Sequence, residues 1–115
     1  MGKIFKEVQN KVILKVGEPA YTVTQISYML DKLNLKYELN LRYPTYTADR
    51  IREVAKKNKI MVNLDELKID LPTSGHFAIC YIQKSKINEL FDVLKIPSIS
   101  VFDLEKIAGE LNYPT

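Results

Sequence analysis

The sequence TVTQISYMLDKLNLKYELNLR, residues 22–42, predicts a helix followed directly by a strand. Thr22 and Gln25 have the spacing of a capping box, in which two side chains satisfy the free amides at the start of a helix. From Leu35 to Tyr43, apolar and polar residues alternate strictly, which is typical of a strand with one face in solvent. The residues that give the helix one apolar face are Ile26, Met29, Leu30 and Leu33.

Helices and strands also alternate on either side of this stretch. Apolar residues at helical spacing predict further helices at residues 3–16, 48–58, 86–94 and 101–111. Short apolar runs predict strands at residues 60–64, 67–71 and 77–82. Residues 11–16 also fit a strand. We therefore expect an α+β fold, a two-layer domain with helices packed on one face of a three- to four-stranded mixed or antiparallel sheet.

The chain has 115 residues, which suits a single domain over residues 1–115 with its own buried core. Its one cysteine, Cys80, excludes an intramolecular disulfide and fits a reducing compartment. The longest apolar run, Phe77–Ile82, is too short for a signal peptide or a membrane span. We expect a cytoplasmic protein that does not enter a membrane.

Few residues could carry catalytic chemistry. His76 is the only histidine, and on a strand it would lie about 13 Å from Cys80, too far for a thiolate–imidazole pair. Two such side chains are too few for a zinc site, and no glycine-rich phosphate-binding motif is present. The acidic residues Asp65, Glu66 and Asp70 lack the spacing of a calcium loop. We predict a protein that is not an enzyme and that uses no metal or cofactor, while a nuclease built only on carboxylates or tyrosines stays open.

Positive charge is concentrated in residues 42–59, which hold six basic and two acidic residues, whereas the whole chain has a net charge of +3. Basic side chains neutralise phosphates, and tyrosines can stack on exposed bases. The alternative is an ordinary solvated helix face, since lysines near a helix C-terminus also stabilise the helix. The candidate nucleic-acid-binding residues are Arg42, Tyr43, Tyr46, Arg50, Arg52, Lys56, Lys57 and Lys59.

The same segment can be tested against the helix-turn-helix motif. Ile51, Val54 and Ala55 are spaced like the apolar residues of a first helix. A second helix would have to begin near Asn63, where too few residues precede Pro72. A standard motif is therefore not expected, although a degenerate winged helix remains an option.

Part of the chain also resembles a known family. Residues 47–82, about a third of the chain, follow the order helix, strand, turn, glycine, strand. The residues that carry the likeness are Thr47, Ile51, Lys56, Lys57, Ile60, Val62, Ile69, Leu71 and the run from Gly75 to Ile79. This segment resembles the C-terminal RNA-binding domain of the ninth bacterial large-subunit ribosomal protein, and the resemblance implies RNA as a ligand. The N-terminal half lacks that family's glycine- and lysine-rich start.

Two functions remain in view. The first is a non-enzymatic regulatory or accessory protein that binds DNA or RNA through phosphate contacts of the basic segment. The second is a protein-interaction module, such as a viral or mobile-element factor that acts on a host complex, because tyrosines are favoured at interfaces. A homodimer formed along the predicted strand at residues 36–42 is one form that the second function could take.

Overall fold

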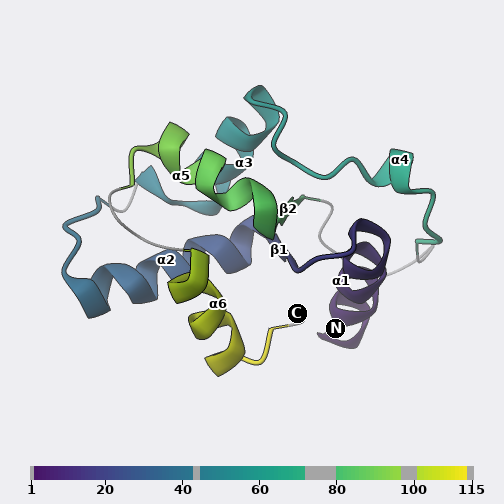
Figure 1. Cartoon of the computed structure of the whole chain (residues 1–115), viewed down its shortest axis with the longest axis horizontal. Coiled ribbons are helices and arrows are strands. Elements are labelled where there is room, and N and C mark those ends of the chain that lie inside the picture. Colours follow the sequence, from purple (N-terminus) through teal and green to yellow (C-terminus); the bar gives the residue numbers. More distant parts are fainter. Residues whose placement is uncertain (1, 43–44, 72–79, 97–100, 114–115) are drawn as a thin grey trace.

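A computed structural model describes residues 2–42, 45–71, 80–96 and 101–113, and it is mostly helical (Figure 1). Its helices surround a very small sheet near the middle of the molecule. In chain order the elements are α1 (Gly2–Val16), β1 (Ala20–Thr22), α2 (Val23–Tyr37), α3 (Ala48–Lys57), α4 (Leu64–Leu67), β2 (Tyr81–Gln83), the 3-10 helix η2 (Lys84–Lys86), α5 (Ile87–Leu94) and α6 (Val101–Glu110).

Two helices begin where their capping residues predict. The Thr22 hydroxyl accepts a hydrogen bond from Gln25 N at 3.0 Å, and Gln25 Oε1 accepts one from Thr22 N at 3.0 Å, which completes the capping box of α2. Thr47 caps α3 by accepting from Arg50 N at 3.2 Å. Because α1 is helical as far as Val16, the alternative strand at residues 11–16 is wrong.

The sheet pairs segments that are far apart in the sequence. β1 is antiparallel to β2, with Tyr21 opposite Ile82. On the other edge of β2, Ile82 forms an isolated antiparallel bridge with Met61. Next to this bridge, Val62 N donates a hydrogen bond of 2.8 Å to Tyr81 O. Among the described residues, β2 therefore lies between β1 and the segment around Met61.

Both faces of this sheet are covered by helices. Successive strand residues point to opposite faces, so Tyr21 and Ile82 join one buried cluster, which includes residues of α2, α3, α5 and α6. Ala20 and Tyr81 join a second cluster, which includes residues of α1 and is packed against residues of α4. In Figure 1, α1 and α4 accordingly lie on one side of the strands and the other four helices on the other side.

The expected α+β fold, with helices on one face of a three- to four-stranded sheet, is therefore wrong. Over residues 2–42, 45–71, 80–96 and 101–113 the structure is mostly helical, and the sheet has only two antiparallel strands, with helices on both faces. Several of the alternating apolar residues that suggested more strands instead lie in helices or irregular segments and pack into the two buried clusters from there.

The strand expected at residues 35–43 is the clearest error. α2 continues to Tyr37 and ends at Glu38, which adopts the left-handed conformation with φ 49°. Leu35 and Tyr37 are exposed, whereas Leu39 and Leu41 lie partly buried against the larger cluster. The alternation thus spans a helix end and an irregular connection rather than one strand.

The other predicted strands are shorter or missing in the described residues. At 60–64 only the bridge at Met61 forms, because Asn63 caps α4 by accepting from Asp65 N at 3.0 Å and the chain turns into that helix. No strand is found at residues 67–71. The strand expected at 77–82 is represented by β2, and residues 77–79 lie outside the described part of the chain.

Candidate nucleic-acid interface

The candidate site centres on α3, which is buried along one side only. Ile51, Val54 and Ala55 are buried against α2 and α5 and fix how the helix is oriented. All the charged residues of the helix are exposed on the remaining surface: Asp49, Arg50, Arg52, Glu53, Lys56 and Lys57. The apolar stripe therefore turns a charged face outward, as the sequence predicts.

Both arginines of α3 form ion pairs within the helix. Arg50 Nη1 lies 3.1 Å from Glu53 Oε1, and Arg52 Nη1 lies 3.1 Å from Asp49 Oδ1. All four side chains are about half exposed or more. Exposed pairs of this kind are worth about 0–1 kcal/mol, so either guanidinium can exchange its carboxylate for another anion at little cost.

Three lysines at the end of α3 are exposed and have no ion pair among the described residues: Lys56, Lys57 and Lys59. Successive helix residues turn by about 100°, so Lys56 follows Arg52 along one flank of the exposed face and Lys57 follows Arg50 along the other. The lysines also lie at the negative end of the helix dipole, which favours their charge.

The end of α3 holds Lys59 in a defined place. Ile60 N donates to Ala55 O at 2.9 Å and Lys59 N donates to Lys56 O at 3.3 Å, the pair of bonds that defines a Schellman motif. Lys59 occupies the left-handed position of this motif, with φ 56°, where glycine is usual. Because Ile60 is buried directly after it, the Lys59 backbone is anchored beside the helix end.

The remaining predicted site residues do not all join this surface. Arg42 is exposed in the connection before α3, where its carbonyl accepts from Thr45 N at 2.9 Å. Tyr43 lies outside the described residues. Tyr46 is 3% exposed in the larger buried cluster, and its hydroxyl donates to Asp31 Oδ1 at 3.1 Å. Its buried ring has no free face on which a base could stack.

Sequence reasoning missed the residues that fix the connection between α2 and α3. Asn34 holds Leu41 by two hydrogen bonds, and its Nδ2 also donates to the Tyr46 hydroxyl at 3.4 Å. Asp31, one turn earlier on α2, accepts from the same hydroxyl. The only sequence signal for them was that Asp31 and Asn34, two polar residues three positions apart, lie beside the apolar stripe of α2. This spacing does not identify their hydrogen-bond partners.

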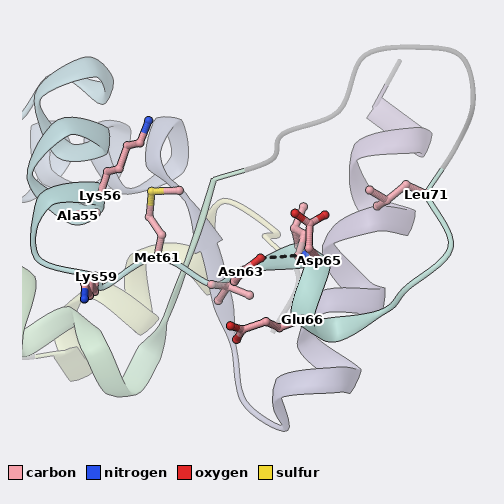
Figure 2. Close-up of a pocket in the computed structure, with 10 residues that line it drawn as sticks. Ala55, Lys56, Lys59, Met61, Asn63, Asp65, Glu66 and Leu71 are labelled. Atoms are coloured by element: carbon pink, nitrogen blue, oxygen red, sulfur yellow. Dashed lines mark hydrogen bonds between the residues drawn. The ribbon is translucent and has the colours of Figure 1, made fainter.

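An open groove of about 650 Å³ adjoins the basic end of α3. Figure 2 shows Lys56 and Lys59 on one side of Met61, and Asp65 and Glu66 of α4 on the other. The two walls therefore carry opposite charge. Because carboxylates repel phosphates, the acidic wall should limit how far a bound nucleic acid backbone extends from α3 toward α4.

The thiol of Cys80, the only cysteine in the sequence, is buried. Burial raises the pKa of the Cys80 thiol, and the nearby charge of Arg52 opposes this only in part. No group of three or more potential metal ligands occurs within the described residues, and His76 lies outside them. No helix in the same part of the chain is long and apolar enough to cross a membrane.

Comparison with known proteins adds no assignment. No family model, curated protein or solved structure matches this chain. The local resemblance of residues 47–82 to a ribosomal RNA-binding domain therefore has no support beyond the residues that carry it.

Proposed function

We propose that this chain is a non-enzymatic nucleic-acid-binding protein, a regulatory or accessory factor, whose main contact surface is the exposed face of α3. The observation that carries the proposal is the exposure of every basic residue of this helix and of Lys59 just after its C-cap, while the apolar residues of the same helix face inward. The contact residues would be Arg50, Arg52, Lys56, Lys57 and Lys59, with Arg42 as an additional candidate.

Two features of the charges support phosphate binding. The lysines at the helix end have no carboxylate partner among the described residues, so binding a phosphate costs them no existing ion pair. The arginines have exposed partners only, and such pairs are weak. Each cation that meets a phosphate releases counterions, which is the main source of salt-dependent affinity.

The experiment is fluorescence anisotropy with labelled duplex DNA, single-stranded DNA and duplex RNA of about 20 residues in low salt. The variant Lys56→Gln/Lys57→Gln/Lys59→Gln should bind at least about 10-fold more weakly than the wild type. The matched control is Lys6→Gln/Lys15→Gln/Lys106→Gln, which removes the same charge from exposed positions on α1 and α6. Equal losses in the two triple variants, or no binding by the wild type, would exclude α3 as the contact surface.

A second candidate function, a protein-interaction module, is favoured by one observation on α2. Tyr28 and Leu35 lie seven residues apart, hence on one side of the helix, and are 46% and 74% exposed. Lys32 lies between them, with its Nζ 5.3 Å from the centre of the Tyr28 ring. Exposed apolar groups with lysines between them favour a partner with acidic side chains.

This second candidate can be tested with an acidic amphipathic peptide helix. In an NMR titration, shifts confined to the Tyr28–Leu35 face would support it, and the absence of shifts there would exclude it. The homodimer expected along a strand at 36–42 has lost its basis, because that strand does not form. A role as a viral or mobile-element factor stays a prediction.

A further inference from the structure

The order in which the elements pair restricts how α3 could meet a nucleic acid. Along the chain, α1 is followed by β1, then by α2 and α3, then by the Met61 segment, the short helix α4 and β2. In space, β2 lies between β1 and the Met61 segment. This strand order, with the last segment between the first two, is the order found in the sheet of a winged helix, whereas α1 lies on the face of the sheet opposite α2 and α3.

Within that arrangement α3 is the second helix of the helix pair. α2 and α3 pack against each other through the larger buried cluster. Their connection, residues 38–47, has ten residues rather than the three or four of a standard helix-turn-helix. The bonds from Asn34 and Asp31 hold this longer connection on α2, so α3 keeps a fixed orientation despite it.

The size of α3 fits the major groove of B-form DNA. A helix of ten residues is about 15 Å long and, with side chains, about 10–12 Å wide. The major groove of B-DNA is about 12 Å wide and admits a helix, whereas the major groove of A-form RNA is deep and too narrow for side chains to read. A helix that is buried on one side only presents the shape that the wider groove accepts.

The charges along α3 are sorted in a way that suits this groove. Arg50 and Arg52 lie in the first half of the helix, the part that contacts base edges when a recognition helix enters the groove. A guanidinium can donate two hydrogen bonds to guanine. The lysines at the other end are positioned for phosphates, which fix register without reading sequence.

We propose that α3 is a recognition helix that binds duplex DNA in the major groove, with Arg50 and Arg52 reading bases and Lys56, Lys57 and Lys59 holding phosphates. This inference rests on the proposed nucleic-acid binding and narrows it to one substrate class. Asp49 and Glu53, between the two arginine flanks, can accept hydrogen bonds from cytosine amino groups once their arginines turn to the DNA.

The test begins with selection of preferred 20-bp duplexes from a random pool by the full chain. The selected duplex is then treated with dimethyl sulfate, which methylates guanine N7 in the major groove and adenine N3 in the minor groove. Methylation of N7 should interfere with binding at specific guanines. A duplex RNA of matched sequence should compete at least about 10-fold less well than the DNA.

Two conservative variants separate base reading from charge. Arg50→Lys and Arg52→Lys keep the charge but lose the bidentate donor geometry. Each should reduce the preference for the selected duplex over a scrambled one by about 10-fold, with little change in binding to the scrambled duplex. Lys106→Arg, at an exposed position on α6 outside the proposed contact surface, serves as the control and should leave the preference unchanged.

The outcomes are distinguishable. Three results would overturn the major-groove inference and leave nucleic-acid binding in place. They are interference only at adenine N3, equal competition by duplex RNA, and an unchanged preference in both arginine variants. The absence of binding to every nucleic acid would overturn both proposals.

Discussion

The side-chain amide of Asn34 pairs with the backbone of Leu41 as a neighbouring strand would. Leu41 N donates to Asn34 Oδ1 at 2.9 Å, and Asn34 Nδ2 donates to Leu41 O at 3.2 Å. Leu41 thus satisfies both of its backbone polar groups without a sheet. Because the segment that it belongs to leads to α3, this pair helps to fix the orientation of the proposed interface.

Replacing Asn34 by alanine should lower the free energy of unfolding by about 2 kcal/mol, since two hydrogen bonds to a partly buried backbone are lost. Asn34→Asp keeps the acceptor for Leu41 N and should cost less. Urea denaturation followed by circular dichroism measures both changes. If the two variants were equally stable to within error, the acceptor half of the pair, which only Asn34→Asp keeps, would contribute nothing.

Lys59 offers a substitution that separates stability from binding. Because Lys59 has φ 56°, Lys59→Gly should relieve backbone strain and raise the free energy of unfolding by about 0.5 kcal/mol, even as it removes a phosphate contact. Lys59→Gln removes the charge but keeps the strain. Both variants should bind duplex DNA more weakly than the wild type, and only the glycine variant should be more stable in thermal denaturation. A glycine variant that lost stability would contradict the role of φ at this position.

The buried tyrosines of the sheet predict alkaline unfolding. Burial raises the pKa of Tyr81 to about 12 and also raises that of Tyr21, where Glu105 adds to the effect. An unfolded tyrosine releases its proton near pH 10. Between about pH 10 and 12 the unfolded chain has lost a proton that folded Tyr81 keeps, so the free energy of unfolding falls as the pH rises.

The measurement is urea denaturation at pH 9 and pH 11. Tyr81→Phe should lose less stability between these two pH values than the wild type does. The exposed-ring variant Tyr28→Phe should behave like the wild type. A wild-type chain and Tyr81→Phe with the same pH dependence would show that Tyr81 ionises alike in both states.

The acidic wall of the groove should weaken nucleic-acid binding. Asp65→Asn/Glu66→Gln removes two negative charges opposite Lys56 and Lys59 and should tighten binding by about 2- to 5-fold at low salt, with a smaller effect at high salt because the charges are exposed. Asp92→Asn/Glu110→Gln changes the net charge equally at exposed positions on α5 and α6. Anisotropy titrations in which both double variants gained the same affinity would point to net charge rather than to the position of this wall.

Much of the helical structure could be predicted because its signals are local. The capping box at Thr22 and the N-cap at Thr47 act within one turn, and the apolar stripes of α2 and α3 are visible in the sequence. The sheet could not be predicted in the same way. β1 has only three residues, too few for a pattern, and its partner β2 lies about sixty residues later in the chain.

The candidate site was predicted in part for the same reason. The exposure of the basic residues follows from the stripe at Ile51, Val54 and Ala55, whereas the burial of Tyr46 depends on Asp31 and Asn34 of a different helix. The comparison with the helix-turn-helix motif took the helix at 48–58 as the first of a pair. In the proposed arrangement that helix is the second, after a connection of ten residues rather than three or four.

The central claim, that the end of α3 binds phosphates, is tested most directly by the salt dependence of binding. The logarithm of the association constant for duplex DNA is plotted against the logarithm of salt concentration for the wild type and for Lys56→Gln/Lys57→Gln/Lys59→Gln. Each lost phosphate contact should reduce the slope by about 0.9, so the triple variant should lose between one and three times that value. Identical slopes for the two proteins would contradict the account.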